Sequence, residues 1–275
     1  MVALGASPAT EPPDRVDLPG EGRCTSSRTP RSAPALALLA FGLVAPLLPV
    51  DPAPRPVAVV TAPVAAHEVV PVVGEAPALP VPEVLTDVVG TPAVARTVAL
   101  TFDDGPDPRW TPQVLDLLAR HHAVATFCLL GENAARHPEL VRAIVDAGMR
   151  LCDHSRSHVI DPAAPGDGLA HAELVDLAGT EVPWFRAPGG AWSPALQAAA
   201  GAAGMRPLGW SVDSRDWTRP GVDAIVAQVQ RGIHPGAVVL LHDGGGHRDQ
   251  TVAALEQLLP WLEAQCWTTG FPDGA

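Results

Sequence analysis

The chain has 275 residues and a formal net charge of −12, and its only basic side chains apart from histidine are arginines. The negative charge disfavours binding to nucleic acid or to an anionic membrane surface. The absence of lysine excludes Schiff-base catalysis and a P-loop, because both need that residue.

The N-terminal region has the pattern of an export signal. Arg23, Arg28 and Arg31 precede an apolar run at 33–50 that carries no charge. Its prolines suit a cleaved signal peptide, while its length of about 18 residues would just allow a membrane-spanning signal anchor. We therefore predict a signal peptide or signal anchor at 1–50 and a secreted or cell-surface protein; an unstructured Pro/Ala-rich tail is the alternative.

Residues 51–95 are rich in proline, valine and alanine, which predicts an extended, semi-rigid linker. From residue 96 on, short apolar runs alternate with amphipathic stretches, which predicts repeated β-α units around a parallel sheet. The expected strands are 97–102, 124–130, 149–153, 183–186, 206–213 and 237–242. The expected helices are 112–120, 132–147, 197–204, 222–232 and 250–264, with a short one near 169–177.

Polar residues follow two of these strands in a pattern that suits a metal ion. Asp103 and Asp104 end the first strand, at the edge where α/β folds place their chemistry. Adjacent carboxylates repel each other, and a cation relieves that repulsion. His154 and His158 follow the third strand, and one helical turn would place both on one face. Together with Asp104 they make a two-histidine, one-carboxylate set with open positions, which suits zinc, cobalt or nickel.

Three more strand ends carry polar clusters. They contain Arg186, then Asp213, Asp216 and Trp217, and finally His242. Each cluster alone has an ordinary explanation as a turn or a solvated loop. Five such clusters at five strand ends indicate an active site.

In this order the five clusters resemble the motifs of the polysaccharide deacetylases, the NodB-homology domain of carbohydrate esterase family 4. They stand as TFDDG at 101–105, HSRSH at 154–158, RAPGG at 186–190, DSRDW at 213–217 and LLH at 240–242. The resemblance spans roughly residues 96–265 and implies a distorted, incomplete (β/α) barrel. We therefore predict a polysaccharide deacetylase catalytic domain at 96–270.

The resemblance implies a metal-dependent hydrolase that cleaves the carbon–nitrogen bond of an N-acetylated sugar. A divalent ion, most simply zinc, would be held by Asp104, His154 and His158. Asp103 would act as general base on metal-bound water, oriented by Arg186, and His242 would act as general acid. A buried carboxylate would raise the pKa of His242; either Asp213 or Asp216 could serve, and we favour Asp216.

Further residues are expected to contact the substrate. Trp217, with Leu240 or Leu241, would enclose the acetyl methyl group. Trp110 could stack on a sugar ring or could equally cap the barrel. The segment 159–185 is short for the family, so the groove rim beside it is expected to be altered. Cys128 and Cys152 lie on neighbouring expected strands and could form a disulfide or remain free thiols.

The sequence leaves the substrate open between peptidoglycan, chito-oligosaccharides and O-acetylated xylan. An O-acetyl xylan esterase on the same scaffold and a non-catalytic wall-binding module are the alternatives. A serine esterase is disfavoured, because no Gly-x-Ser-x-Gly occurs. The expected partner is an acetylated glycan, with no nucleic acid and with membrane contact only through an N-terminal anchor.

Overall fold

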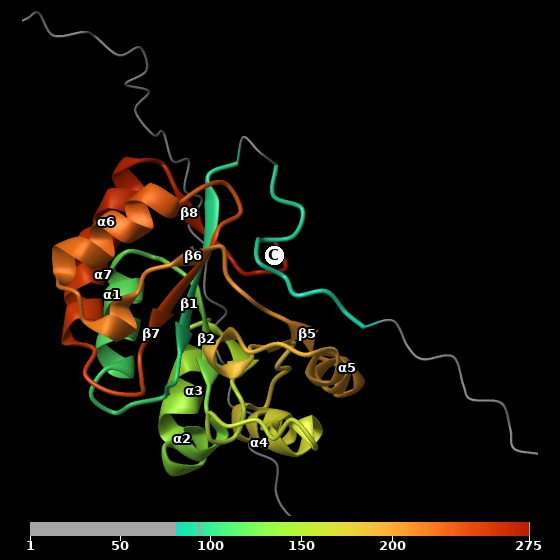
Figure 1. The fold of residues 1–275 in the computed structure, drawn as a ribbon. Coiled ribbons are helices and arrows are strands. Elements are labelled where there is room, and N and C mark those ends of the chain that lie inside the picture. The colour runs from blue at the N-terminus through green and yellow to red at the C-terminus, as the bar shows by residue number, and fades with distance from the viewer. Residues whose placement is uncertain (1–80, 93–94, 275) are drawn as a thin grey trace, which may run out of the picture. The chain divides into compact units, whose positions relative to one another are not determined.

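The computed structural model describes residues 81–92 and 95–274 (Figure 1). The predicted signal segment at 1–50 and most of the predicted linker lie outside the described residues. Within the described ranges, no helix is both long enough and apolar enough to span a bilayer.

A curled parallel sheet forms the centre of the described part of the chain (Figure 1). Its strand order is β5-β4-β3-β2-β1-β7-β6, with β8 paired to β1. The strands are β1 (Thr97–Asp103), β2 (Ala125–Leu129), β3 (Arg150–Asp153), β4 (Trp184–Phe185), β5 (Arg206–Pro207), β6 (Val212–Asp213), β7 (Val238–His242) and β8 (Thr268–Thr269). The ends β5 and β6 do not pair with each other in this order, so the predicted incomplete barrel is confirmed.

Helices surround the sheet. They are α1 (Thr111–Arg120), α2 (Gly131–Arg136), α3 (Pro138–Asp146), α4 (His171–Ala178), α5 (Pro194–Ala202), α6 (Val222–Gly232) and α7 (Asp249–Ala264). Proline occupies the first turn of α1, α3 and α5, where its missing N–H costs no hydrogen bond. The hydroxyl of Ser193 also caps α5 by accepting the N–H of Leu196.

Two predicted elements are wrong in their extent. The helix expected at 132–147 is two helices, α2 and α3, because Pro138 disfavours helical backbone at His137 before it. The strand expected at 206–213 is also two elements, β5 and β6, which lie at opposite edges of the sheet. Pro207 has no N–H to continue a ladder, and the chain crosses the open side of the barrel between the two strands.

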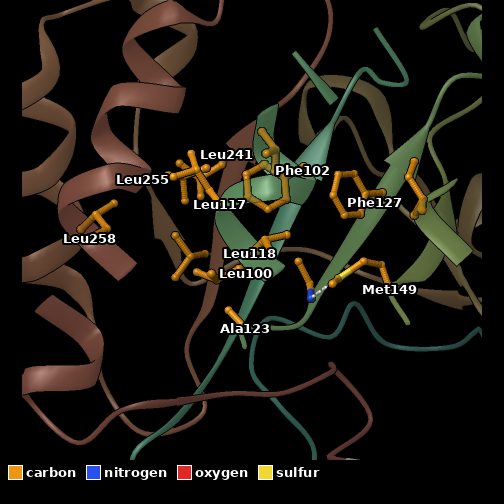
Figure 2. Close-up of a cluster of buried hydrophobic side chains, with 14 of the residues drawn as sticks. Leu100, Phe102, Leu117, Leu118, Ala123, Phe127, Met149, Leu241, Leu255 and Leu258 are labelled. Carbon is orange, nitrogen blue, oxygen red and sulfur yellow. Dashed lines mark hydrogen bonds between the residues drawn. The ribbon is translucent and has the colours of Figure 1, made fainter. Parts of the chain in front are cut away.

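The main hydrophobic core lies between the sheet and the helices. On β1, Leu100 and Phe102 face this layer, and Phe102 stacks on Phe127 of β2 with ring centroids 5.2 Å apart (Figure 2). Leucines of α1 and α7 cover them, including Leu117 and Leu255 (Figure 2). Because strand side chains alternate, the residues between these positions face the inside of the barrel.

A second cluster fills the inside of the barrel. It contains Ala99, Cys128, Cys152, Trp184, Leu208, Val238 and Val88. Val88 belongs to the predicted linker, yet it is buried, and the flanking Leu85 and Asp87 form bridges to Leu208 and Ala237. The boundary predicted at residue 96 is therefore too late: apolar side chains at 85 and 88 fill the open side of the barrel, so this segment belongs to the domain.

Cys128 and Cys152 lie opposite each other in the register of β2 and β3. Both are buried free thiols. Of the two alternatives that the sequence left open, the structure therefore has the free thiols.

We expect Phe127→Ala to lower the free energy of unfolding by about 3–5 kcal/mol, because it deletes a fully buried ring and its stacking on Phe102. Urea denaturation followed by circular dichroism would measure the change. Val159→Ala is the control: this side chain is 67% exposed, so a change within about 0.5 kcal/mol is expected. Equal effects of the two substitutions would contradict the assignment of the core.

Candidate active site

The end of β1 places two acid groups at the top of the barrel. Asp103 is the last residue of the strand and points inward, while Asp104 leaves the strand with a positive φ of 70°. The Asn133 side chain donates a hydrogen bond to the Asp104 carbonyl at 2.8 Å. Gly245 passes so close that a Cβ there would lie 2.4 Å from Asp104 Oδ2. The glycine-rich loop after β7 thus fixes the position of Asp104.

Asp104, His154 and His158 form a group that could hold a metal ion. Their ligand atoms all lie within 4.8 Å of one another. Oδ1 of Asp104 is 3.5 Å from Nε2 of His154 and 3.4 Å from Nε2 of His158, and it has no hydrogen-bond partner although it is buried. A buried, unpartnered carboxylate oxygen facing two imidazole nitrogens fits a divalent cation.

The two histidines do not lie on a helical turn, so that part of the prediction is wrong. Residues 154–158 form a loop in which Ser155 and His158 both have positive φ. The Ser155 hydroxyl accepts the N–H of His158 at 3.0 Å, and Nδ1 of His154 lies 2.8 Å from the Arg186 carbonyl. One hydrogen bond within the loop and one to the Arg186 carbonyl therefore hold the two imidazoles near each other.

Asp153 supports this loop and was not predicted. Its carboxylate accepts the N–H of Ser155 at 2.7 Å and of Ala170 at 2.9 Å, which ties the loop to the start of α4. Burial raises the pKa of Asp153 to about 7, against the opposing effect of these N–H donors. Its position directly before His154 is the sequence signal that could have identified it.

Arg186 and Asp103 form a buried ion pair beside the metal group. Nη1 of Arg186 donates to Oδ1 of Asp103 at 2.7 Å and to the Thr101 hydroxyl at 2.8 Å. Burial by itself would raise the pKa of Asp103, but the charge of Arg186, helped by His154 and His242, outweighs burial and lowers it. Asp103 is therefore held in its ionised form.

His242 and Asp216 form the second pair, and His242 lies opposite Asp103 in the register of β7 and β1. Nδ1 of His242 lies 2.7 Å from Oδ1 of Asp216, and the Thr251 hydroxyl donates to Oδ2 of the same carboxylate at 2.8 Å. Burial by itself would lower the pKa of His242, but the hydrogen bond and the charge of Asp216 outweigh burial and raise it. Asp213 instead accepts the backbone N–H of Arg215 at 2.8 Å. The geometry thus pairs His242 with Asp216.

One cavity of about 400 Å³ joins these groups. Its lining consists of Asp103, Asp104, His154, His158 and His242 together with Gly189, Trp210, Asp213, Trp217 and Leu240. Leu241 does not line it, because the alternation of β7 turns it into the main core. Trp110 does not line it either: its indole N–H donates to the Gly246 carbonyl at 2.8 Å, and the ring packs against the main core. Trp210 was not predicted; it stands three residues before Asp213.

Asp243, the residue after His242, was also not predicted. It is fully buried beneath the loop that carries Asp104, and its Oδ2 accepts the Thr111 hydroxyl at 2.5 Å. A Cβ at Gly105 would lie 2.4 Å from Oδ1 of Asp243, so only glycine fits there. Asp243 therefore packs against the end of the TFDDG motif at 101–105 and supports it.

The curled barrel places the possible metal group at the carboxyl end of its parallel strands, which is an arrangement compatible with a metal-dependent hydrolase. Comparison with known proteins agrees with this class. The family model of the polysaccharide deacetylases matches residues 91–208. A chitooligosaccharide deacetylase of Bradyrhizobium sp. (strain ANU 289) is 42% identical over 195 residues, which cover 64% of this chain and 87% of that protein.

Two further similar proteins are also deacetylases of N-acetylated sugars. A peptidoglycan-N-acetylglucosamine deacetylase of Bacillus cereus is 41% identical over 177 residues, covering 62% of this chain and 83% of that protein. The crystal structure of a peptidoglycan N-acetylglucosamine deacetylase superposes with a TM-score of 0.63 at 34% identity, covering 66% of this chain and 88% of the other. The chain belongs to the polysaccharide deacetylase family. Members of this family hydrolyse carbon–nitrogen bonds other than peptide bonds.

We expect Asp216→Asn to lower the pKa of His242, because it removes the nearest negative charge that stabilises the imidazolium against the effect of burial. NMR titration of the metal-free protein would measure the shift. Asp213→Asn is the matched control and should leave the pKa of His242 unchanged, since Asp213 bonds to the Arg215 N–H. A shift caused by Asp213→Asn alone would assign the partner to Asp213.

Proposed function

We propose that the protein removes acetyl groups from N-acetylglucosamine residues of peptidoglycan or of a chito-oligosaccharide, with Asp103 as general base and His242 as general acid. The observation that carries the proposal is the arrangement of two oppositely tuned pairs, Asp103 with Arg186 and His242 with Asp216, around one cavity that also contains the possible metal group. The relatives named above supply the class of substrate.

Asp104, His154 and His158 would hold a divalent ion, and zinc is the simplest choice for this set of ligands. When bound, such an ion would acidify a water molecule and polarise the acetyl carbonyl. The unpartnered Oδ1 of Asp104 is the observation that fits this role.

The residues around this group would move the protons. Asp103 accepts a proton from the attacking water, and it can do so because Arg186 keeps its carboxylate ionised. His242 donates a proton to the nitrogen of the leaving sugar, and it can do so because Asp216 favours the imidazolium. The amine needs that proton, because an unprotonated amine is a poor leaving group.

The wall of the cavity would bind the acetyl group and the sugar. Leu240 and Trp217 present apolar surface to the methyl group, and Trp217 is 52% exposed, so part of it is accessible to a sugar. Trp210 adds a second indole to the same wall.

The substrate proposal is tested by acetate release from a panel of acetylated glycans. We expect release from chito-oligosaccharides or from peptidoglycan N-acetylglucosamine to exceed release from O-acetylated xylan. A preference for xylan would establish the O-acetyl esterase instead. No acetate from any member, with the metal group loaded, would favour the non-catalytic wall-binding module.

We expect Asp103→Asn to keep the metal but lose most of its turnover, because this carboxylate would accept a proton and need not ligate the ion. Asp104→Asn should lose metal affinity, because Asp104 belongs to the ligand set. Equilibrium dialysis with zinc and acetate release measure the two properties separately. Loss of the metal in Asp103→Asn would show that the roles of the two aspartates are exchanged.

We expect His242→Ala to depress turnover of the amide substrate on the order of a hundred- to ten-thousand-fold and to affect an activated aryl acetate much less. A phenolate departs without protonation, whereas the amine does not. Parallel assays of chito-oligosaccharide and nitrophenyl acetate provide the measurement. Equal losses on both substrates would make His242 a positioning residue.

We also propose export of the protein, on the strength of the arginines and the uncharged apolar run at 33–50. Deleting residues 1–66 should retain the protein in the cytoplasm of the producing cell, as judged by fractionation. Continued export after the deletion would rule out this signal.

A further inference from the structure

Residues 84–89, here called the strap, cover the open side of the barrel between β5 and β6. The N–H of Leu85 donates to the Pro207 carbonyl at 2.9 Å, and the Leu85 carbonyl accepts the N–H of Gly209 at 2.7 Å. A few residues on, the N–H of Val88 donates to the Gly236 carbonyl at 2.7 Å. The strap therefore joins the chain after β5 to the chain before β7.

One peptide group connects the strap to Arg186. The carbonyl of Leu208 accepts Nε of Arg186 at 3.2 Å, while the N–H of Gly209, in the same peptide group, donates to Leu85. The Gly209 carbonyl accepts Nη2 of Arg186 at 2.8 Å. Because a peptide group is planar, it cannot turn away from Leu85 without also turning away from Arg186.

Arg186 passes this restraint on to Asp103. Its guanidinium is rigid and planar, so the two bonds to the carbonyls of Leu208 and Gly209 set the direction in which Nη1 reaches Oδ1 of Asp103. We propose that the strap is a positioning element of the active site, which orients Asp103 through the 208–209 peptide and Arg186. The proposal rests on the role of Asp103 proposed above.

The packing around Gly209 agrees with this role. A Cβ at Gly209 would lie 3.0 Å from Cγ1 of Val84 and 3.3 Å from Cγ2 of Thr86, so any larger residue at 209 would push these side chains of the strap away from the peptide. The C-terminal end of the strap is held by two other contacts. Oδ1 of Asp87 lies 2.8 Å from Nε2 of His234, and the N–H of Val89 donates to the Pro272 carbonyl at 3.0 Å. The two ends of the strap can therefore be tested separately.

The test compares Leu85→Pro with Val89→Pro in the full chain. Each substitution removes one backbone donor of the strap, but only the N–H of Leu85 holds the strap to the segment 207–209, by its bond to the Pro207 carbonyl next to the Gly209 N–H that the Leu85 carbonyl accepts. Val89 precedes Gly90, whose φ of 70° suits a turn with proline before it. We expect Leu85→Pro to reduce kcat on the order of tenfold to a hundredfold, with KM and zinc affinity unchanged, and Val89→Pro to leave kcat unchanged.

A second comparison distinguishes misplacement of Asp103 from a general disturbance of the fold. In an Asp103→Asn background, Leu85→Pro should cause no further loss of the residual kcat, because the group that it misplaces has already been removed. An undiminished kcat in Leu85→Pro, or an equal loss in both backgrounds, would overturn the proposal. Full turnover of Asp103→Asn alone would refute the proposed role of Asp103, and the positioning proposal with it.

If Leu85→Pro fails to fold, Gly209→Ala can replace it, and the same reduction of kcat is expected. It removes no hydrogen-bonding group and only pushes Val84 and Thr86 away from the peptide. A loss of kcat that disappears in the Asp103→Asn background would support the proposal, and unchanged kcat in folded Gly209→Ala would contradict it.

Discussion

The buried guanidinium of Arg186 is the constraint on which the rest of the barrel top depends. A fully buried cation is costly unless it is paired and fully hydrogen-bonded. Here the Asp103 carboxylate supplies the opposite charge, while the Thr101 hydroxyl and the carbonyls of Leu208 and Gly209 accept its other N–H groups. These partners come from β1 and from the chain after β5, and Arg186 itself follows β4. One side chain thus fixes the relative positions of three segments that are far apart in sequence.

The same acid side chain behaves differently at four buried positions, and the difference lies in its partners. Asp103 and Asp216 each face a cation or an imidazole, so their pKa values are lowered in spite of burial. Asp153 and Asp243 are buried with neutral partners, N–H groups for one and a hydroxyl for the other, and burial raises the pKa of each to about 7. Asp103 and Asp216, which face charged partners, take part in the proposed proton transfers. Asp153 and Asp243 instead support the loops that carry the possible metal ligands. Environment, rather than residue type, divides the four into chemical and supporting groups.

The sequence predicted the parallel sheet and the clusters at its strand ends because both follow from local patterns: alternating apolar runs and polar residues directly after them. It failed where the structure is decided by contacts that an apolar or polar pattern does not reveal. Residues 81–92 have the composition of a linker, yet Leu85 and Val88 find an open barrel side that no local pattern reveals. The histidines at 154 and 158 have helical spacing, but the hydrogen bonds of Asp153 and Ser155 fold them as a loop. The sequence does not distinguish Leu240 from Leu241 as the residue that contacts the acetyl group. In the structure β7 directs only Leu240 into the cavity, and Leu241 packs in the main core.

The size of the inward side chains differs from strand to strand. Trp184 on β4 and Arg186, which follows β4, are both large and fully buried. The strands that face them carry small inward residues: Ala99 and Thr101 on β1, Cys128 on β2 and Cys152 on β3. The two thiols are small apolar side chains inside the barrel, and burial raises the pKa of Cys128, which keeps its thiol protonated. In the register of the sheet Cys152 lies beside both Cys128 and Trp184, so small residues stand next to the largest buried one. The interior thus combines large side chains at β4 with small ones on β1, β2 and β3, and within it Arg186 reaches Asp103 and Thr101.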